Sequence, residues 1–401
     1  MIARTTRLES DVDLNDVARG DGYLFVREGV GFAGRGVAAR VPIDEAVEFL
    51  AAIEHDHENK DEDKDEDKVG GIGPIALGAL PFLPSAPATL VVPAVVVSKD
   101  RRGRAWVTRI DGADQSLVGT PGPVPTASSY TLRPLVDVDH YLAAVAAARD
   151  AVREGRMDKA VIARPIAVES DQPIDVHAVL LRLKATFGSS HRFSIDGFIG
   201  ASPELLVEVD GDLVRSFPLA GTTRTTGDPD LDAQLAAELQ ASPKNQIEHR
   251  AAIEMVRDTL LPYCSYLDWA PEPEIVKVAN VQHLGSQAEG MLSHPAPTVI
   301  ELVRALQPTP AVGGYPREEA IDLITSVEGF ERGLYGGAVG WVDAKGNGRW
   351  AVSLRCAELS EDRRTARLVA GGGIVADSDP RSELAETQAK FQAMLSAIVR
   401  P

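Results

Sequence analysis

The stretch at residues 371–390, GGGIVADSDPRSELAETQAK, most constrains what this chain can fold into. Three glycines follow an apolar run, and glycine lets backbone N–H groups approach a ligand closely because no Cβ intervenes. Asp379 stands where a helix N-cap belongs, with a proline directly after it, so a helix is predicted to begin there. Glu383, Glu386 and Lys390 then share one helix face. The stretch is either an anion cradle beside two carboxylates and an ammonium, or an ordinary solvated helix face with an i,i+4 ion pair.

The rest of the chain mixes long helical patterns with short apolar runs that are typical of strands. Amphipathic periodicity predicts helices, and apolar runs bounded by turn residues predict strands. Helices are predicted at residues 43–53, 139–154, 176–186 and 243–261. Strands are predicted at 23–26, 29–32, 90–97, 159–168, 192–199, 205–207 and 213–219, with a β-meander at 338–342, 350–356 and 366–370. Long helices mixed with antiparallel strands indicate the α+β class.

Residues 1–130 give weaker signals and are interpreted as the N-terminal part of the fold. They contain the low-complexity tract HDHENKDEDKDEDK at 55–68, whose composition predicts a mobile acidic insertion at about 54–69. Residues 119–129 are rich in proline, serine and threonine, and are interpreted as a linker. Residues 131–401 carry the sharper patterns and are expected to form the catalytic region.

The composition argues against several classes of partner. The net charge is −18 and the sequence pI is near 4.9, which disfavours nucleic acid and anionic lipid because both are polyanions. A small anionic substrate in a local basic pocket stays compatible with this charge. Cys264 and Cys356 are too few for a disulfide framework and lack metal-ligand spacing, so a reducing cytoplasm is expected. The N-terminus shows no apolar signal segment, and no apolar run approaches the length of a membrane span.

Glu248 is a second informative carboxylate, because apolar residues follow it at i+4, i+7 and i+8 on one helical stripe. A carboxylate on an apolar stripe is costly to bury unless it is paired or bound to a metal. Mg²⁺ commonly takes one or two protein carboxylates and leaves positions for substrate oxygens and water. Glu248 together with Glu383 and Glu386 fits that pattern. The alternative is an i−4 ion pair between Glu248 and Lys244.

Two further residues have an acid–base interpretation. Lys159 begins an otherwise apolar strand, where it is either a surface lysine or, if desolvated, a neutral amine that acts as a base. Glu204 follows a Ser-Pro pair in a tight corner, where a carboxyl can be held as a general acid, although an exposed turn carboxylate is commoner. His283, Tyr335 and Arg355 also have ordinary structural interpretations, as a core histidine, a core-edge tyrosine and a salt-bridged strand arginine.

Eight motifs follow one another between residues 136 and 400. They are SPE at 202–204, PLAGT at 218–222, KNQIEH at 244–249, QPTPAVGGYP at 307–316, LYGGAVGW at 334–341, RCA at 355–357, the glycine run at 371–380 and the ExxExxxK helix after it. In this order they resemble the chorismate-utilising enzymes, which include anthranilate, aminodeoxychorismate, salicylate and isochorismate synthases. The resemblance implies one large α+β domain, in which antiparallel sheets pack as a sandwich-like core flanked by helices. It covers the N-terminal third only loosely.

Within this family the residues favour an isochorismate synthase, an isomerase that converts chorismate to isochorismate with Mg²⁺. Similar aminodeoxychorismate synthases often carry a nucleophilic lysine where Ala220 stands, and alanine cannot form that covalent intermediate. Lys159 occupies the position of the general base in the branch that uses water, and residues 308–312 resemble isochorismate synthases more than salicylate synthases. Asn245 departs from relatives that have an acidic residue there. The alternatives are a salicylate synthase, which also eliminates pyruvate, and a non-catalytic module that binds an anion or Mg²⁺.

The resemblance also implies the roles of the site residues. Glu248 and Glu386 would hold Mg²⁺ and with it the ring carboxylate, while Glu383 would act behind them through water. Lys159 would deprotonate the water that attacks C2, and Glu204 would protonate the departing C4 hydroxyl. The enolpyruvyl carboxylate would meet a tyrosine, an arginine and N–H groups of the glycine run. The residues expected to bind substrate are Gly221, Thr222, His283, Ala311, Tyr335, Arg355, Gly371, Gly373 and Lys390.

The expected partner is the small-molecule substrate chorismate alone. The sequence has no Cys–His amidotransferase signature, so no glutamine amidotransferase partner is expected. The protein is expected to be a cytoplasmic monomer without nucleic-acid or membrane partners. Its product would feed menaquinone or siderophore biosynthesis.

Overall fold

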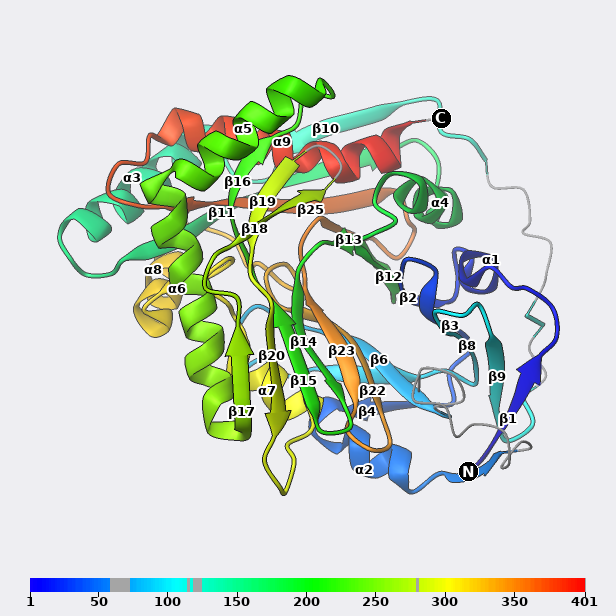
Figure 1. Cartoon of the computed structure of the whole chain (residues 1–401). Coiled ribbons are helices and arrows are strands. Elements are labelled where there is room, and N and C mark those ends of the chain that lie inside the picture. Colours follow the sequence, from blue (N-terminus) through cyan, green and yellow to red (C-terminus); the bar gives the residue numbers. More distant parts are fainter. Residues whose placement is uncertain (58–72, 114–115, 118–124, 279–280, 401) are drawn as a thin grey trace.

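The computed structural model describes residues 1–57, 73–113, 116–117, 125–278 and 281–400. Within these residues the strands form three sheets, and helices lie outside the two larger sheets (Figure 1). The two large sheets face each other across a hydrophobic core. The prediction of an α+β fold with sandwiched antiparallel sheets flanked by helices is therefore confirmed.

The largest sheet has thirteen strands within the described residues, all antiparallel except for the parallel pair β1–β5. Its strand order is β10 (Tyr130–Pro134), β11 (Lys159–Ser170), β25 (Thr365–Ile374), β24 (Cys356–Leu359), β13 (Phe198–Ser202), β12 (His191–Ile195), β2 (Tyr23–Arg27), β3 (Val30–Arg35), β8 (Val95–Lys99), β9 (Ala105–Ile110), β1 (Ile2–Leu8) and β5 (Glu54–His57), with β21 (Gly314–Tyr315) beside β11. Strands from both ends of the chain therefore share one sheet.

The second sheet has nine strands and the third has three, again among the described residues. The nine run in the order β17 (Cys264–Trp269), β20 (Ala288–Leu292), β15 (Leu213–Phe217), β14 (Leu205–Asp210), β23 (Gly348–Val352), β22 (Ala338–Asp343), β6 (Ile75–Leu80), β7 (Thr89–Val92) and β4 (Ala39–Pro42). The three are β16 (Leu219–Arg224), β19 (Val281–Gly285) and β18 (Glu274–Val278).

The helices pack on the outer faces of these sheets. They are α1 (Leu14–Ala18), α2 (Ala46–Ala51), α3 (Val138–Arg153), α4 (Val176–Thr186), α5 (Pro229–Ala241), α6 (Pro243–Leu260), α7 (Val299–Leu306), α8 (Arg317–Val327) and α9 (Pro380–Val399), with 3₁₀ turns at Ile43–Glu45 and Leu261–Tyr263. Helices α3, α8 and α9 contact β11 and β25 of the large sheet, and α2 and α7 contact the nine-stranded sheet. Helices α5 and α6 contact β16 and lie along one side of the molecule in Figure 1.

Alternating side chains in the strands account for this layering, because successive residues of a strand point to opposite faces. In β25, Val369 joins the core between the large sheets, whereas Leu368 and Ala370 join the core under α4 and α9. In β23, Ala351 faces the inner core, whereas Trp350 packs toward α6 and α7. Both sheets are thus buried on two faces. The cavity described below opens beside β25, beyond Leu368, where the pairing of β25 with β24 stops.

Several strand predictions were wrong in detail. Residues 90–97 form β7 and β8, and residues 213–219 are divided between β15 and β16, in each case in different sheets. Residues 192–199 form not one strand but the hairpin β12–β13, because Asp196 and Gly197 both adopt positive φ, at 49° and 82°, in a tight turn. Residues 338–370 form no meander, since β22 and β23 belong to the nine-stranded sheet whereas β24 and β25 belong to the large one. The chain crosses between the sheets at Arg355, where φ is 49°.

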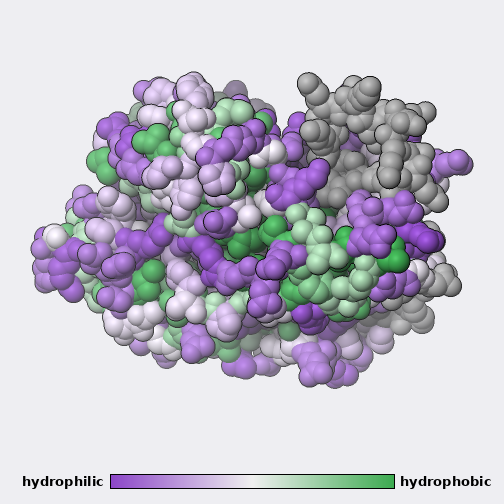
Figure 2. Space-filling view, turned by 90° about the horizontal axis from the view of Figure 1, so that it is seen from below, coloured by the Kyte–Doolittle hydropathy of each residue, from purple (hydrophilic) through white to green (hydrophobic). Residues whose placement is uncertain are grey.

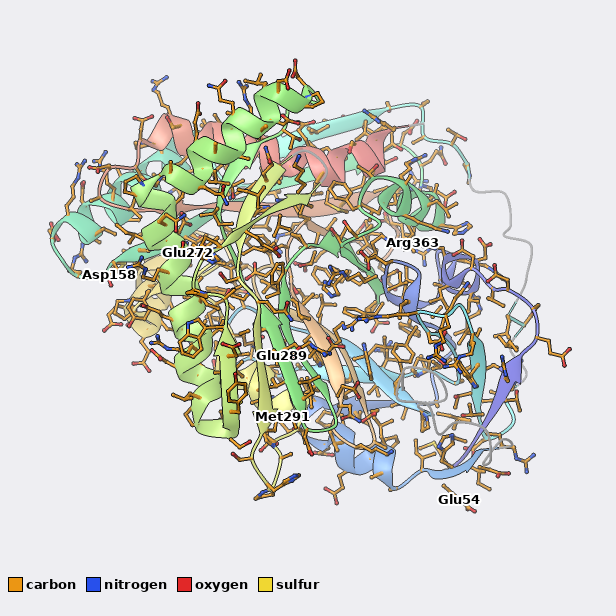
Figure 3. All side chains as sticks on the ribbon, in the orientation of Figure 1. Glu54, Asp158, Glu272, Glu289, Met291 and Arg363 are labelled. Carbon is orange, nitrogen blue, oxygen red and sulfur yellow. The ribbon has the colours of Figure 1, made fainter. Side chains whose placement is uncertain are left out.

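The predicted acidic insertion begins later than expected. Residues 54–57 form β5, which pairs in parallel with β1 near the N-terminus, and Figure 3 labels Glu54 at its start. Residues 58–69 of the predicted insertion lie outside the described residues. The predicted linker at 119–129 lies partly outside them as well.

The face seen in Figure 2, which is the underside of Figure 1, is mostly hydrophilic with smaller hydrophobic areas between the polar ones. This agrees with the strongly acidic composition of the chain. In the part of the chain that the structure describes, no helix combines the length and apolarity needed to cross a membrane.

Candidate active site

A cavity of about 230 Å³ lies beside β25, between α6, α9 and the three-stranded sheet. Twelve of the fourteen residues predicted for the site line it, although they come from distant parts of the sequence: Glu204, Gly221, Thr222, Glu248, His283, Ala311, Tyr335, Arg355, Gly371, Gly373, Glu386 and Lys390. The other two, Lys159 and Glu383, do not line the cavity but contact its wall. The structure thus brings the predicted site together.

The glycine run forms the end of strand β25, and the N–H groups of Gly371 and Gly373 face the cavity. Val161 donates its N–H to Gly313, and Ala163 donates to a Glu328 carboxylate, so neither points its N–H toward β25. Gly373 and Gly371, which lie opposite these two residues, therefore point their N–H and C=O groups away from β11. On that side β24 pairs only as far as Leu368, so the described strands leave these groups facing the cavity.

The glycines are also required by their neighbours. A Cβ on Gly372 would lie 2.7 Å from Glu383 Oε2. A Cβ on Gly373 would lie 2.7 Å from Lys159 Cε and 2.8 Å from Glu248 Oε1. These distances are shorter than real Cβ contacts, so any side chain here would displace charged groups of the site.

Glu204 lies in the corner between β13 and β14 and is only 2% exposed. Burial raises its pKa to about 8, although a backbone contact with Leu219 and the charge of Lys159 act in the opposite direction. Because this pKa lies above neutral pH, the carboxyl holds its proton there. The ordinary interpretation of an exposed turn carboxylate is wrong, and Glu204 is placed to donate a proton into the cavity.

Lys159 is buried at the start of β11, and its Nζ donates to Glu248 Oε1 at 2.6 Å. Asp158, the residue before it, lies on the same side of the molecule as α6, which carries Glu248 (Figure 3). The described residues contain no ion pair between Glu248 and Lys244, so the predicted alternative partner is wrong. Lys159, the candidate base, therefore bonds to Glu248, a candidate metal ligand that lines the cavity.

Helix α9 begins as predicted, since Asp379 accepts a hydrogen bond from the backbone of Ser382. Glu383 Oε1 accepts from Ser378 at 2.9 Å, whereas its Oε2 is buried without a partner among the described residues. Burial raises the pKa of Glu383, and the neighbouring Glu386 carboxylate raises it further. Helix α9 therefore carries, at Glu383, a buried carboxyl with one oxygen that accepts no hydrogen bond from the described residues.

Glu386 Oε1 lies 2.7 Å from Lys390 Nζ, which also donates to the carbonyl of Gly371 at 2.8 Å. The charge of Lys390 lowers the pKa of Glu386, although burial acts against it. The i,i+4 pair expected for an ordinary helix face is present, but both of its residues line the cavity. The α9 face belongs to the site.

Arg355 and His283 form a neutral–cationic pair on the opposite wall. Arg355 Nη2 lies 3.2 Å from His283 Nε2, while His283 Nδ1 lies 3.2 Å from Gly221 O and 3.0 Å from Thr222 Oγ1. Burial lowers the pKa of His283 to about 3, and the charges of Arg355 and Lys390 lower it too, so the ring is neutral at neutral pH. Nε2 then accepts from Arg355, and Nδ1 carries the proton toward Gly221.

Arg355 is available to an anionic ligand. The described residues contain no ion pair between Arg355 and an acidic side chain, so the predicted structural alternative of a salt bridge is wrong. Burial lowers the pKa of Arg355 to about 10, which still leaves the guanidinium charged at neutral pH. Tyr335 lines the same part of the cavity, and burial raises the pKa of its phenol. A bidentate guanidinium suits a carboxylate.

The carboxylates fit a divalent metal, although none of the described residues form a ready cluster of three or more His, Cys, Asp or Glu. A Cβ built on Gly372 would lie 2.7 Å from Glu383 Oε2 and 3.8 Å from Glu386 Oε1. A Cβ built on Gly373, the next residue, would lie 2.8 Å from Glu248 Oε1. Mg²⁺ prefers such oxygen donors. A cation here would compete with Lys159 and Lys390 for their carboxylates.

Several lining residues were not among the predicted site residues, although Ala220 and Asn245 had been noted in comparing the branches of the family. They are Pro203, Leu219, Ala220, Lys244, Asn245, Leu354, Cys356, Leu368, Val369, Ala370, Phe391 and Met394. Most are apolar and give no chemical signal in the sequence. Lys244 and Asn245, however, stand in the KNQIEH motif, where only Glu248 was assigned a role in the site.

Residues 47–399 match the protein family described as chorismate binding enzyme. The chain belongs to the chorismate-binding enzymes. The family predicted from the ordered motifs is thereby confirmed, and the match extends into the N-terminal third. Three relatives carry isochorismate synthase names: "Putative isochorismate synthase MenF" of Mycobacterium tuberculosis strain H37Rv, isochorismate synthase DhbC of Bacillus subtilis and isochorismate synthase EntC of Escherichia coli K12.

The likeness to these chorismate-binding enzymes covers most of each chain. The M. tuberculosis protein is 41% identical over 82% of this chain and 87% of its own length. For the B. subtilis protein the values are 36%, 81% and 81%, and for the E. coli protein 35%, 82% and 82%. The solved structure of a "putative 2,3-dihydroxybenzoate-specific isochorismate synthase" from Bacillus anthracis is 33% identical, with a TM-score of 0.80 over 96% of this chain and 98% of that one. E. coli MenF, at 24% identity and a TM-score of 0.82 over 99% and 94%, shares the fold.

Proposed function

We propose that this protein is an isochorismate synthase that converts chorismate to isochorismate with Mg²⁺, adding water at C2 and expelling the C4 hydroxyl. The observation that carries the proposal is Glu204, a buried carboxyl with a pKa of about 8 on the wall of the cavity. It provides a protonated acid at neutral pH, which a departing hydroxyl requires. The names of the relatives over most of the chain support the same reaction.

The enolpyruvyl carboxylate of chorismate would bind Arg355, Tyr335 and the N–H groups of Gly371 and Gly373. The guanidinium offers paired donors, and the two N–H groups face the cavity from the open side of β25. His283 holds Arg355 in place, since its neutral ring accepts from Nη2. Gly221, Thr222 and Ala311 complete this wall.

The ring carboxylate would bind at the α9 wall. Glu248 and Glu386 would hold Mg²⁺ there, with Glu383 behind them through water. The ion would neutralise and orient the ring carboxylate. Lys390 links Glu386 to the Gly371 carbonyl, and so ties the metal ligand to the glycine run.

Lys159 would take the proton from the attacking water, and Glu204 would give a proton to the leaving hydroxyl. Lys159 must be neutral to act as a base, so its 2.6 Å contact with Glu248 must open during the reaction. Among the described residues Glu204 has no ion-pair partner, and it stays protonated at neutral pH. The proton removed by Lys159 must later reach Glu204 to close the cycle, because the net reaction is an isomerisation.

The amination branch of the family is disfavoured for this chain. Ala220 lines the cavity where an aminodeoxychorismate synthase would place its nucleophilic lysine. We therefore propose a cytoplasmic, monomeric enzyme that acts on chorismate without an amidotransferase partner. Its product would enter menaquinone or siderophore biosynthesis.

The direct test is incubation of the purified protein with chorismate and Mg²⁺, followed by chromatographic identification of the products. Isochorismate in equilibrium with chorismate is expected, and its formation should stop when the metal is chelated. Salicylate with pyruvate would instead identify a salicylate synthase. No turnover at any Mg²⁺ concentration would leave a binding module and contradict the proposal.

A further inference from the structure

Glu328 and Arg332 form a buried ion pair directly after helix α8. Their side chains are 1% and 2% exposed, and neither residue lines the cavity. Arg332 Nε donates to Glu328 Oε2 at 2.8 Å, and Arg332 Nη2 donates to Glu328 Oε1, so the contact is bidentate. The cost of desolvating two charges offsets much of what such a pair gains, so stability alone is a weak reason for its presence.

The pair occupies a gap along one edge of strand β11. The other edge of β11 pairs with β25 over most of its length. On the edge that faces the pair, β21 contacts the first two residues of β11, and β10 begins to pair only at Ile166. In the gap, the N–H of Ala163 donates to Glu328 Oε1 at 2.7 Å, and the carbonyl of Val161 accepts from Arg332 Nη2 at 2.7 Å. The two side chains thus bind backbone groups that a neighbouring strand would otherwise bind.

The same guanidinium contacts two further segments of the cavity wall. Arg332 Nη1 donates to the carbonyl of Val312 at 2.6 Å, next to Ala311, which lines the cavity. Arg332 Cζ lies 5.9 Å from the centre of the Tyr335 ring, and the backbone N–H of Tyr335 donates to the Arg332 carbonyl. The pair therefore joins three segments that carry site residues, because β11 begins at Lys159.

We propose that the Glu328–Arg332 pair holds β11 at a fixed distance from the Ala311 loop and the Tyr335 turn, and thereby positions Lys159 relative to the substrate. The inference rests on the proposed function, because it assigns the pair to the base and the substrate wall of that enzyme. Both members are positioning residues that act through the backbone and through Tyr335. A displacement of about 1 Å between reacting groups can cost about 10²-fold in rate.

The first test variant is Arg332→Lys, because lysine keeps the positive charge but lacks the planar fork that reaches Glu328 and both backbone carbonyls. At a temperature well below the melting temperature, kcat should fall by about 10- to 100-fold. The KM for chorismate should change less than kcat, since the pair acts on the geometry of the reacting groups. Loss of the charge alone would be rescued by lysine, and loss of the positioning would not.

Hydrogen exchange read by mass spectrometry gives a measurement that does not depend on turnover. In Arg332→Lys, peptides that cover residues 160–164 and 311–313 should lose protection, because their backbone groups lose a buried partner. Peptides from β8 and β9, at the far end of the large sheet, should keep theirs. The second variant, Glu328→Gln, should change rate and protection in the same direction, since an amide cannot pair with the guanidinium.

Asp100→Asn is the matched control. Asp100 is also a buried carboxylate that accepts from an arginine, Arg104 Nε at 2.7 Å, and from backbone N–H groups, but it lies in the turn between β8 and β9 outside the cavity. The control should leave kcat and the protection of β11 unchanged.

Wild-type kcat in Arg332→Lys would overturn the inference, as would wild-type protection of residues 160–164. An equal loss of kcat in Asp100→Asn would overturn it too, because any buried carboxylate would then have the same effect. A wild type that forms no isochorismate, beside the predicted local loss of protection in Arg332→Lys, would instead overturn the proposed function alone.

Discussion

The two walls of the cavity hold glutamates in opposite protonation states. On the sandwich wall, at the corner between β13 and β14, Glu204 is bonded to no lysine of the described residues, and burial raises its pKa to about 8. On the helix wall, which α6 and α9 form, Glu386 bonds to Lys390, and the charge of Lys390 lowers the pKa of Glu386. The residue type and the cavity are the same, but Glu204 is only 2% exposed, whereas the Glu386 side chain is 41% exposed and has a counterion, so burial and pairing both act. A carboxyl that is buried alone becomes an acid, and one that is paired stays an anion.

Lys159 bonds a carboxylate of the helix wall and not Glu204. Its charge reaches Glu204 and acts to lower the pKa of that carboxyl, yet its hydrogen bond goes to Glu248. The two lysines thus bond to the carboxylates that would hold a cation, Lys159 to Glu248 and Lys390 to Glu386, while Glu204 keeps its proton. The division of labour between the walls depends on which carboxylate each lysine bonds.

The largest expected effect comes from removing the anions of the helix wall. Glu248→Gln and Glu386→Gln should each abolish Mg²⁺-dependent turnover, because an amide cannot replace an ionised ligand of a hard cation. Turnover at a range of Mg²⁺ concentrations is the measurement, with circular dichroism to confirm folding. Glu289→Gln, which alters a glutamate paired with Arg215 outside the cavity, is the control. Near-wild-type activity of either variant at low Mg²⁺ would show that its residue is no direct ligand.

The next largest effect is expected when the proposed acid, Glu204, or the proposed base, Lys159, is removed. Glu204→Gln and Lys159→Ala should each lower kcat by at least about 10²-fold, the usual contribution of a general acid or base. Affinity for chorismate should change less. The pH profile of kcat/KM should lose one limb in each variant. An active Lys159→Ala enzyme with an unchanged profile would show that another group activates the water.

A smaller effect is expected from the third carboxylate of the helix wall. Glu383→Gln should weaken Mg²⁺ binding by about 10- to 100-fold and leave turnover at saturating Mg²⁺ largely intact, because the proposed role of Glu383 is to support the ligands through water. The KM for Mg²⁺, measured beside kcat, separates this outcome from that of Glu386→Gln. Equal loss in both variants would place Glu383 among the direct ligands.

The smallest effect is expected away from both walls. Replacing residues 58–69 by a short Gly/Ser linker should leave turnover and melting temperature nearly unchanged, since this acidic composition is typical of solvated segments. The replacement spares Glu54–His57, which form β5. A large loss in either measurement would show that the segment supports the site.

Most of the site could be predicted from the sequence because its groups stand in motifs with local logic. The N-cap at Asp379 and the spacing of Glu383, Glu386 and Lys390 define one helix face without any tertiary information. The contact of Lys159 with Glu248 could not be predicted, since it joins a residue of a strand to a residue of a helix 89 positions later in the sequence. Spacing along one helix suggested Lys244 instead.

The errors in the fold have two origins. The Asp196–Gly197 turn was available in the sequence, because an Asp-Gly pair between apolar runs is a strong hairpin signal. The crossing between sheets at Arg355 was not, since a positive φ at an arginine has no sequence signature.

The protonation state of Glu204 is the most direct test of the account. Infrared difference spectra of wild type minus Glu204→Gln isolate the C=O stretch of a protonated carboxyl at this position. Because the pKa is raised, the band should be present at neutral pH and should disappear as the pH rises, with a midpoint near 8. A band that is already absent at neutral pH, with a midpoint near the ordinary value of 4.5, would show that Glu204 is an anion like Glu386. That result would contradict the division between the two walls.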